Sequence, residues 1–293
     1  MSFDIGEAAG LLGRTETRVA EAHSEPAQLL QATLDRDIDS FKTGAPLPLL
    51  WHWLYFPPLV RQSRLGEDGH TQDSGLLPVV PFLPRRMWAG SRLRSDKPLR
   101  VGDRLTRRSE VVSLTPKIGG SGRLLFITIR HSLNGSSGGS IVEEQDIVLR
   151  EAAGARTPPG KPAAPAAFDF EDVITPTPTL LFRFSALTFN AHRIHYDEPY
   201  ATQVEGYDGL VVHGPLMAVL MLDLAGRVSP GMVSAFEFKA VNPAFVPHPL
   251  AVRAKTTETG FALRVESAGR IASTGNAAVA DVPARHNTTT IAP

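Results

Sequence analysis

The segment from Met217 to Leu224 constrains the fold of this chain most strongly, because Asp223 is its only polar residue. Gly214 and Pro215 precede this segment. Proline suits the first turn of a helix, where its missing N–H would have had no partner. A helix that is apolar nearly all round must be enclosed, for example by a sheet wrapped around it. The sequence therefore predicts a buried helix in the C-terminal half.

Segments with the two-residue alternation of a β-strand follow this helix and also fill much of the first half. Glycine-rich turns such as Asn134 to Gly139 separate them, as in antiparallel hairpins. The acidic residues Glu143, Glu144 and Asp146 lie on one alternating segment, where we expect a solvated face. The predicted strands cover residues 86–93, 104–114, 123–133, 140–150, 233–238, 250–257, 261–267 and 271–280.

Both halves show the same order of elements. Residues 16–37 have helical character, and the apolar run from Leu49 to Phe56 follows a Gly-Ala-Pro-Leu-Pro segment. Residues 152–167 are rich in proline, alanine and glycine, which indicates a semi-extended linker. We therefore predict an α+β chain of two tandem units, residues 1–151 and 168–293, on either side of this linker.

Composition limits the classes of function. The 293 residues include 30 Lys and Arg against 30 Asp and Glu, so no net charge attracts nucleic acid or an anionic membrane. Cysteine is absent, which excludes disulfides, thiolate metal ligands and a cysteine nucleophile. The polar N-terminus has no signal-peptide pattern, and no apolar segment approaches the ~20 residues of a membrane span. We expect a cytoplasmic protein with neither nucleic acid nor a membrane as its partner.

A cluster of polar side chains precedes the predicted buried helix, with Asn190, His192 and His195 close together. Histidine titrates near neutrality, so His195 can accept and return a proton during catalysis. The alternative is a histidine that only hydrogen bonds to a backbone carbonyl. His192 and His195 could also ligate a metal with Asp197 or His213, but neither an HExxH motif nor a cysteine pair supports this. We predict a catalytic His195 and no bound metal.

Three neighbouring residues complete the predicted site. Gly214 would expose a backbone N–H at the positive end of the helix dipole, where it can stabilise an enolate. A tight turn is the alternative reason for this glycine. The Asn190 amide can hold a water or fix a carbonyl, or else close a turn through its own backbone. Arg193 is the candidate for binding a substrate carboxylate.

Together these residues resemble a known motif. The segment Leu187–Asp197, followed by Val212-His213-Gly214-Pro215, is similar to the hydratase motif of the MaoC-like hydratase/dehydratase family. Residues 20–280 resemble its double-hotdog branch, which includes 3-hydroxyacyl-thioester dehydratases of type 2. In the first half, residues 51–56, 86–90 and 143–148 carry the likeness. The resemblance implies a tandem hotdog fold, in which each half wraps an antiparallel sheet around a long buried helix, the first hotdog being degenerate.

The resemblance also assigns roles. The family's catalytic histidine falls on His195 and its oxyanion glycine on Gly214, whereas its aspartate falls on Asn190. An amide cannot share acid and base duties as an aspartate does. Either His195 makes both proton transfers while Asn190 holds the water, or a second acid exists, with His192 as the nearest candidate. His192, Arg193 and His213 would then contact the substrate.

The implied activity is a hydro-lyase that reversibly hydrates an enoyl thioester to its 3-hydroxyacyl form. The expected substrates are short or branched acyl-CoA thioesters such as mesaconyl-C4-CoA or itaconyl-CoA, with no separate cofactor. Acyl carrier protein is an alternative carrier of the thioester. A fatty-acid 3-hydroxyacyl dehydratase, a hotdog thioesterase and a non-catalytic acyl-CoA binding module stay open as alternatives. Both a monomer, acting as a pseudo-dimer of its two hotdogs, and a homodimer fit the sequence.

Overall fold

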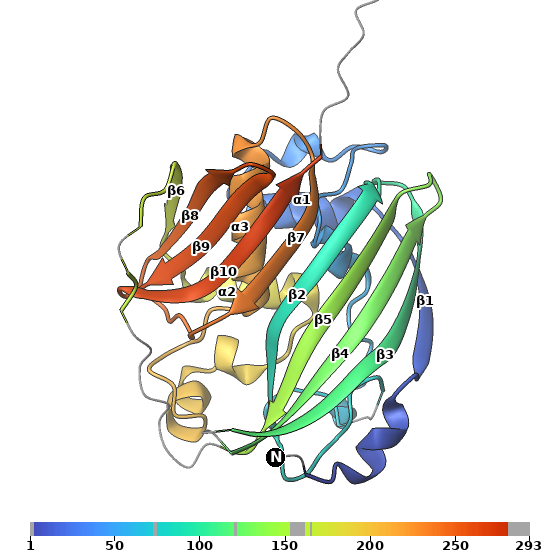
Figure 1. Cartoon of the computed structure of the whole chain (residues 1–293), viewed down its shortest axis with the longest axis vertical. Helices are drawn as coiled ribbons and strands as arrows, with labels where there is room; N and C mark the ends of the chain where they lie inside the picture. Colours follow the sequence, from blue (N-terminus) through green and yellow to red (C-terminus); the bar gives the residue numbers. More distant parts are fainter. Residues whose placement is uncertain (1–2, 73–74, 120–121, 153–161, 165, 281–293) are drawn as a thin grey trace, which may run out of the picture.

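A computed structural model describes residues 3–72, 75–119, 122–152, 162–164 and 166–280 of the chain. In this part of the chain ten antiparallel strands form one sheet, in the order β1-β3-β4-β5-β2-β7-β10-β9-β8-β6 (Figure 1). The first-half strands are β1 (Thr15–Glu21), β2 (Arg85–Lys97), β3 (Arg104–Gly119), β4 (Gly122–Gly135) and β5 (Ser140–Arg150). The second-half strands are β6 (Phe170–Ile174), β7 (Val233–Ala240), β8 (Leu250–Thr257), β9 (Gly260–Ser267) and β10 (Arg270–Val279).

The strands β2 and β7 join the two halves into this one sheet. Gly90 lies opposite Lys239, and Leu93 lies opposite Phe236. A side chain at Gly90 would overlap the carbonyl group of Phe238, so the close approach of the two strands requires glycine there. Every strand that the sequence predicts is present, and the structure extends most of them by a few residues.

Helix α3 (Gly214–Val228) is the predicted buried helix. It contacts β7, β8, β9 and β10 and lies behind these strands in Figure 1. Side chains on all its sides are buried, including Leu216, Val219, Met221 and Leu224. The sheet of the second half therefore encloses it, as an all-round apolar helix requires.

The first half differs from the prediction, because it does not contain a comparable long helix among its described residues. Residues 15–21 form β1, which pairs with β3, and α1 (Ser24–Thr33) begins only after it. The run from Leu49 to Phe56 contains a short 3-10 helix, η3 (Trp51–Tyr55). Pro57 and Pro58 follow directly, and the residue before a proline disfavours helical backbone, so this segment ends where a longer helix would have continued.

The expected solvated face on β5 is wrong for Glu143. Its carboxylate is fully buried and lies 2.8 Å from Nε2 of His52 and 3.1 Å from Nε1 of Trp53. Burial acts to raise the pKa of Glu143, but the hydrogen bond and charge of His52 outweigh it and lower the pKa to about 2. Thus β5 and η3 are tied together by buried hydrogen bonds to the Glu143 carboxylate. Glu144 and Asp146, in contrast, pair with Arg92 at the surface.

Two further predictions concern the linker and membrane-spanning helices. Residues 153–161 and 165 of the predicted linker lie outside the described residues. In the described ranges, none of the helices is both long enough and apolar enough to cross a membrane.

Candidate active site

Helix α2 (Pro178–Thr188) places the polar segment that follows it. Thr177 caps its start by accepting a hydrogen bond from the Leu180 N–H (3.1 Å), and Pro178 occupies its first turn. The helix ends at Phe189, whose φ of 52° lies in the left-handed region. The chain turns back there and passes through the 3-10 helix η5 (Arg193–His195).

The imidazole of His195 is buried and held in one orientation. Its Nδ1 lies 2.7 Å from the Val211 carbonyl oxygen, which can only accept, so Nδ1 carries the proton and Nε2 keeps a lone pair. Burial lowers the pKa of His195 to about 4, and the bond to Val211 opposes this only in part. At neutral pH the ring is therefore uncharged, and Nε2 can accept a proton.

His213 and Gly214 lie beside His195 at the start of α3. The rings of His195 and His213 stack with their centroids 3.6 Å apart. His213 Nε2 is 2.8 Å from the Ser185 hydroxyl, and burial holds the pKa of His213 well below its usual range. Its ring is thus uncharged and fixed by packing. The structure therefore brings His195 and His213, both predicted as site residues, to the positive end of the helix dipole.

The backbone at Gly214 does not itself require glycine. Its φ lies outside the left-handed region, and a Cβ there would meet the Trp88 carbonyl oxygen only at 4.0 Å, an ordinary contact. A tight turn therefore does not explain the residue. An N–H in the first turn of a helix has no partner within that helix, so this donor is available to a ligand.

Asn190 and His192 are joined by a turn. The Asn190 Oδ1 accepts a hydrogen bond from the His192 N–H at 3.0 Å, which is the self-closing turn considered as the structural alternative for Asn190. The two amide N–H groups of Asn190 are left to donate to a water or a substrate. The buried ring of His192 stands edge-on to that of His195, with the centroids 5.5 Å apart. Burial lowers the pKa of His192 to about 2, so this ring is uncharged.

Arg193 is already engaged with other groups. Its guanidinium lies 2.6 Å from the Asp197 carboxylate, donates to the Glu67 carbonyl oxygen at 3.1 Å, and rests over the Tyr200 ring. A cation with these partners has less to gain from a substrate carboxylate. Arg193 therefore stabilises the segment that contains η5, and its predicted contact with substrate finds no support in this geometry.

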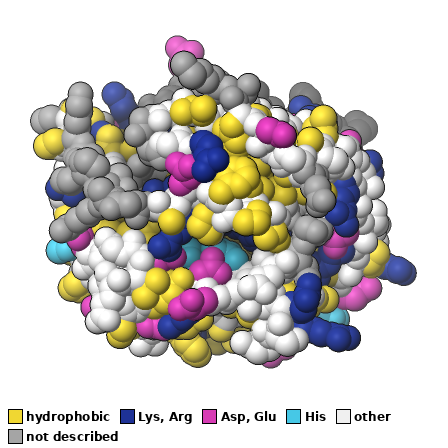
Figure 2. Space-filling view, turned by 90° about the horizontal axis from the view of Figure 1, so that it is seen from below, with side chains coloured by type: hydrophobic (Ala, Val, Ile, Leu, Met, Phe, Trp, Pro, Cys, Tyr) yellow, Lys and Arg dark blue, Asp and Glu magenta, His cyan; other side chains and the backbone are white. Residues whose placement is uncertain are grey.

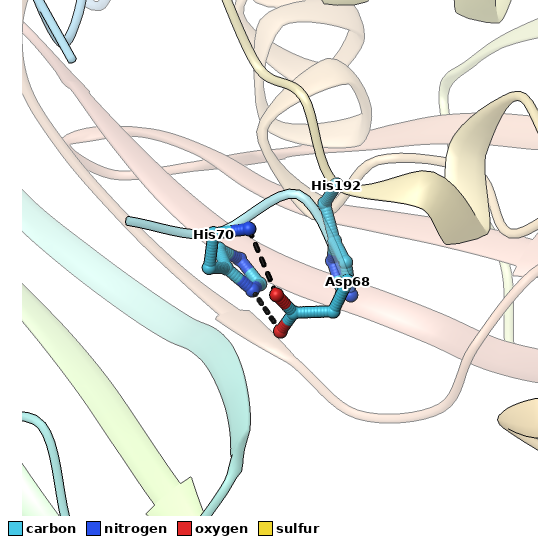
Figure 3. A group of neighbouring side chains, drawn as sticks. All are labelled: Asp68, His70 and His192. Atoms are coloured by element: carbon cyan, nitrogen blue, oxygen red, sulfur yellow. Dashed lines mark hydrogen bonds and ion pairs between the residues drawn. The ribbon is translucent and has the colours of Figure 1, made fainter. Parts of the chain in front are cut away.

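The first half contributes two residues that sequence reasoning missed, Asp68 and His70. They lie on one loop, and the Asp68 carboxylate accepts from the His70 backbone N–H (2.9 Å) and lies 2.8 Å from His70 Nδ1 (Figure 3). The ring of His70 lies 4.1 Å from that of His192, centroid to centroid. The only signal in the sequence is an Asp-Gly-His step between turn residues, which is too common to single out.

Two contacts hold this loop against the histidine segment. The Arg193 N–H donates to the Asp68 carbonyl oxygen at 2.9 Å. Gly69, with φ of 87°, passes so close to Ala191 that a Cβ would overlap the Ala191 carbonyl group. Ligand-type atoms of Asp68, His70 and His192 all lie within 4.8 Å of one another, a donor set that a divalent metal could also use. The predicted lack of a metal stays a prediction.

A cavity of about 380 Å³ opens beside Asp68 and His70. Figure 2 shows a hollow in this face of the molecule, with histidine and acidic side chains inside it and hydrophobic side chains along one edge. The cavity is polar at one end and apolar along a wall formed mainly by first-half residues, which include Val79, Val80, Leu83 and Leu149. A smaller cavity of about 20 Å³ lies between His192, Asp68 and Arg86.

Comparison with solved structures defines the class of protein. A MaoC-like dehydratase from Phytophthora capsici superposes with a TM-score of 0.68 at 14% identity, over 95% of this chain and 98% of that one. A Mycobacterium tuberculosis protein described as a double hotdog superposes with a TM-score of 0.54 at 17% identity, over 92% and 96%. The chain thus has the MaoC-like double-hotdog fold that the sequence predicts.

Sequence comparison narrows this class to one family. Residues 50–246 match the family described as hydroxyacyl-thioester dehydratase type 2. The mesaconyl-C(4)-CoA hydratase of Chloroflexus aurantiacus is 44% identical over 246 residues, which are 83% of this chain and 87% of that protein. This chain belongs to the hydroxyacyl-thioester dehydratase type 2 family.

Proposed function

We propose that this chain, a hydratase/dehydratase of acyl thioesters by its family, adds water across an enoyl thioester with His195 as the base. One observation carries the proposal. The hydrogen bond from Nδ1 of His195 to the Val211 carbonyl leaves Nε2 unprotonated, and the same ring stacks on His213, the residue directly before α3. A base next to a backbone donor suits chemistry in which an enolate forms.

The steps follow from these two groups. The thioester carbonyl oxygen accepts a hydrogen bond from the Gly214 N–H, an interaction that typically contributes ~3 kcal/mol to the transition state. Nε2 of His195 takes a proton from a water whose oxygen bonds to C3, and the C2–C3 π electrons move to the thioester oxygen. Protonation at C2 then completes the 3-hydroxyacyl product. Dehydration is the same path in reverse.

The proton for C2 is best supplied by His70. His192, the nearest acid suggested by the sequence, has a pKa of about 2, so its acidic imidazolium form is absent at neutral pH. His70 lies on the far side of His192, at the edge of the larger cavity, and its Nδ1 is bound to the Asp68 carboxylate. A carboxylate so placed orients an imidazole. In this proposal His70, oriented by Asp68, takes the proton-transfer role that the resembled family assigns to its aspartate.

The substrate, partners and location extend this proposal. The similarity to a mesaconyl-C(4)-CoA hydratase supports a short, branched acyl-CoA, and the first half supplies the apolar wall for its acyl group. We further propose that the chain is a monomer containing both hotdogs and that it is located in the cytoplasm. Acyl carrier protein is proposed as an alternative carrier of the thioester. Light scattering on the purified chain distinguishes the monomer from a homodimer.

The test is an ultraviolet assay of enoyl-thioester loss with crotonyl-, mesaconyl-C4- and itaconyl-CoA, run together with a thiol assay. A hydratase removes the double bond without releasing CoA. Release of free CoA from a saturated acyl-CoA would favour the thioesterase, and saturable binding without turnover would favour the binding module.

Substitution of His195 tests its role directly. His195→Gln should lower hydration by about 10²- to 10⁴-fold, the usual contribution of a general base. His248→Gln is the matched control, because His248 is exposed in the loop before β8. Full activity in the His195→Gln enzyme would end the assignment.

A further inference from the structure

Arg86 lies at the start of β2, the strand of the first half that pairs with β7 of the second half. The strand alternates there, so Arg86 and Trp88 face the same side while the exposed Met87 faces the other. The Trp88 carbonyl oxygen is the atom nearest to a Cβ built on Gly214. Two residues of a strand span roughly 7 Å. Arg86 therefore lies about that far along β2 from the residue whose carbonyl oxygen faces Gly214.

Arg86 also borders both of the cavities described above. It lines the small cavity together with His192 and Asp68, and the larger one together with His70. Leu149, its partner on β5, belongs to the apolar wall of the larger cavity. An acyl group held along this wall would thus have Arg86 at its end.

The guanidinium of Arg86 lacks a counterion among the described residues. Its Nε is buried and makes no hydrogen bond within this part of the chain, and Asp68, the carboxylate whose charge acts on it, is itself paired with His70. Burial lowers the pKa of Arg86, and the more distant charge of Asp68 opposes this only in part. A partly buried cation without a partner is costly, and proteins normally pair such charges.

Two other arginines near the candidate site are paired, unlike Arg86. Arg85 also lines both cavities but forms an ion pair with Glu205 and donates to the Val204 carbonyl oxygen. Arg193, the sequence candidate for a carboxylate contact, is paired with Asp197. Of these three arginines, only Arg86 has its charge free for a ligand.

We infer that Arg86 binds a free carboxylate on the acyl group, so that the site selects thioesters of dicarboxylic acids. This inference rests on the proposed function, because it places the substrate carbonyl at Gly214. The planar guanidinium matches a carboxylate with two parallel hydrogen bonds. A phosphate of coenzyme A has related chemistry, but the whole pantetheine arm separates it from the thioester carbon.

The kinetic test compares two thioesters that differ at one group. 3-Methylcrotonyl-CoA has a methyl where mesaconyl-C4-CoA has its carboxylate. The wild-type enzyme should prefer the charged substrate. Arg86→Gln should lower kcat/KM for mesaconyl-C4-CoA by roughly 100-fold, as expected for losing one partner of a buried charge pair. For 3-methylcrotonyl-CoA it should change kcat/KM less than about threefold. Equal losses on both substrates, or no preference in the wild type, would overturn the inference.

Two controls distinguish a carboxylate contact from a structural role and from a phosphate contact. Arg86→Lys keeps the charge and should restore much of the preference, and removing an unpaired buried charge in Arg86→Gln should not lower the melting temperature. Weaker inhibition by free coenzyme A in Arg86→Gln, with the substrate preference intact, would instead assign Arg86 to a phosphate.

A binding measurement keeps this inference separate from the proposed function. Calorimetry with the His195→Gln enzyme compares affinities for the two thioesters without turnover. Tighter binding of the charged thioester that disappears in the Arg86→Gln double variant supports Arg86 even if the wild type proves not to be a hydratase. Turnover without any such discrimination refutes Arg86 alone.

Discussion

Replacing Gly214 with alanine tests whether this glycine is needed for the fold or for the chemistry. The structure predicts little cost in stability. A Cβ at this position meets nothing closer than 4.0 Å, and the backbone is not left-handed. Alanine is favoured over glycine inside helices by roughly 0.5–1 kcal/mol, so the free energy of unfolding should stay the same or rise by up to that amount. The corresponding rise in melting temperature is at most about 4 °C.

Activity should respond in the opposite direction. The added methyl stands at the start of α3, where the thioester oxygen must approach the Gly214 N–H closely. Loss of one such oxyanion donor typically lowers kcat by 10²- to 10³-fold. The same ultraviolet assay, with thermal unfolding measured on the same sample, gives both quantities.

The matched control is Gly226→Ala in the same helix. Gly226 is exposed, and a Cβ there would meet nothing within 4 Å. It should stabilise the protein by a similar amount and leave activity unchanged. If Gly214→Ala is as active as Gly226→Ala, the substrate does not approach this N–H and the oxyanion role is wrong. If it unfolds the protein, the glycine serves the fold after all.

Three other predictions concern the loop, acid stability and metals. Gly69→Ala should displace the loop that contains His70 and lower both activity and stability, the free energy of unfolding by at least about 1 kcal/mol. Gly10→Ala is the control, because a Cβ at Gly10 meets open space and should lower neither. An active Gly69→Ala enzyme would argue against a role for His70. His131 and His195 titrate near pH 4 when folded and near 6.5 when unfolded, so the unfolded chain binds protons first as the pH falls. Urea unfolding should therefore show stability falling from about pH 6.5 to 4, by about 1.4 kcal/mol per pH unit for each histidine; a flat profile would contradict the buried neutral rings. Dialysis against a chelator should leave hydration unchanged, and activity that is lost and then restored by zinc would reveal a metal at Asp68, His70 and His192.

Local sequence was sufficient to single out those residues of the candidate site that lie close together in the chain. His195, His213 and Gly214 come from one short stretch of sequence, and the buried helix of the second half could be recognised from its apolar residues alone. The strands were predictable for the same reason, because alternation and hydrophobic burial are properties of neighbouring residues. The equally local prediction at residues 16–37 was wrong for β1, since pairing with β3 overrode its helical character.

Only the tertiary structure could decide which distant residues join this stretch. Asp68 and His70 meet His192 across more than a hundred residues of sequence, and Glu143 meets His52 in the core. The sequence alone does not distinguish Arg86 from Arg193, yet in the structure Arg193 is paired with a carboxylate and Arg86 is not. Periodicity in the sequence indicates which face of a strand is buried. Which residues of the other half that face contacts depends on long-range pairing, such as that of β2 with β7. The chemistry of the site depends on those contacts, because a charge or a proton donor acts only on the groups beside it.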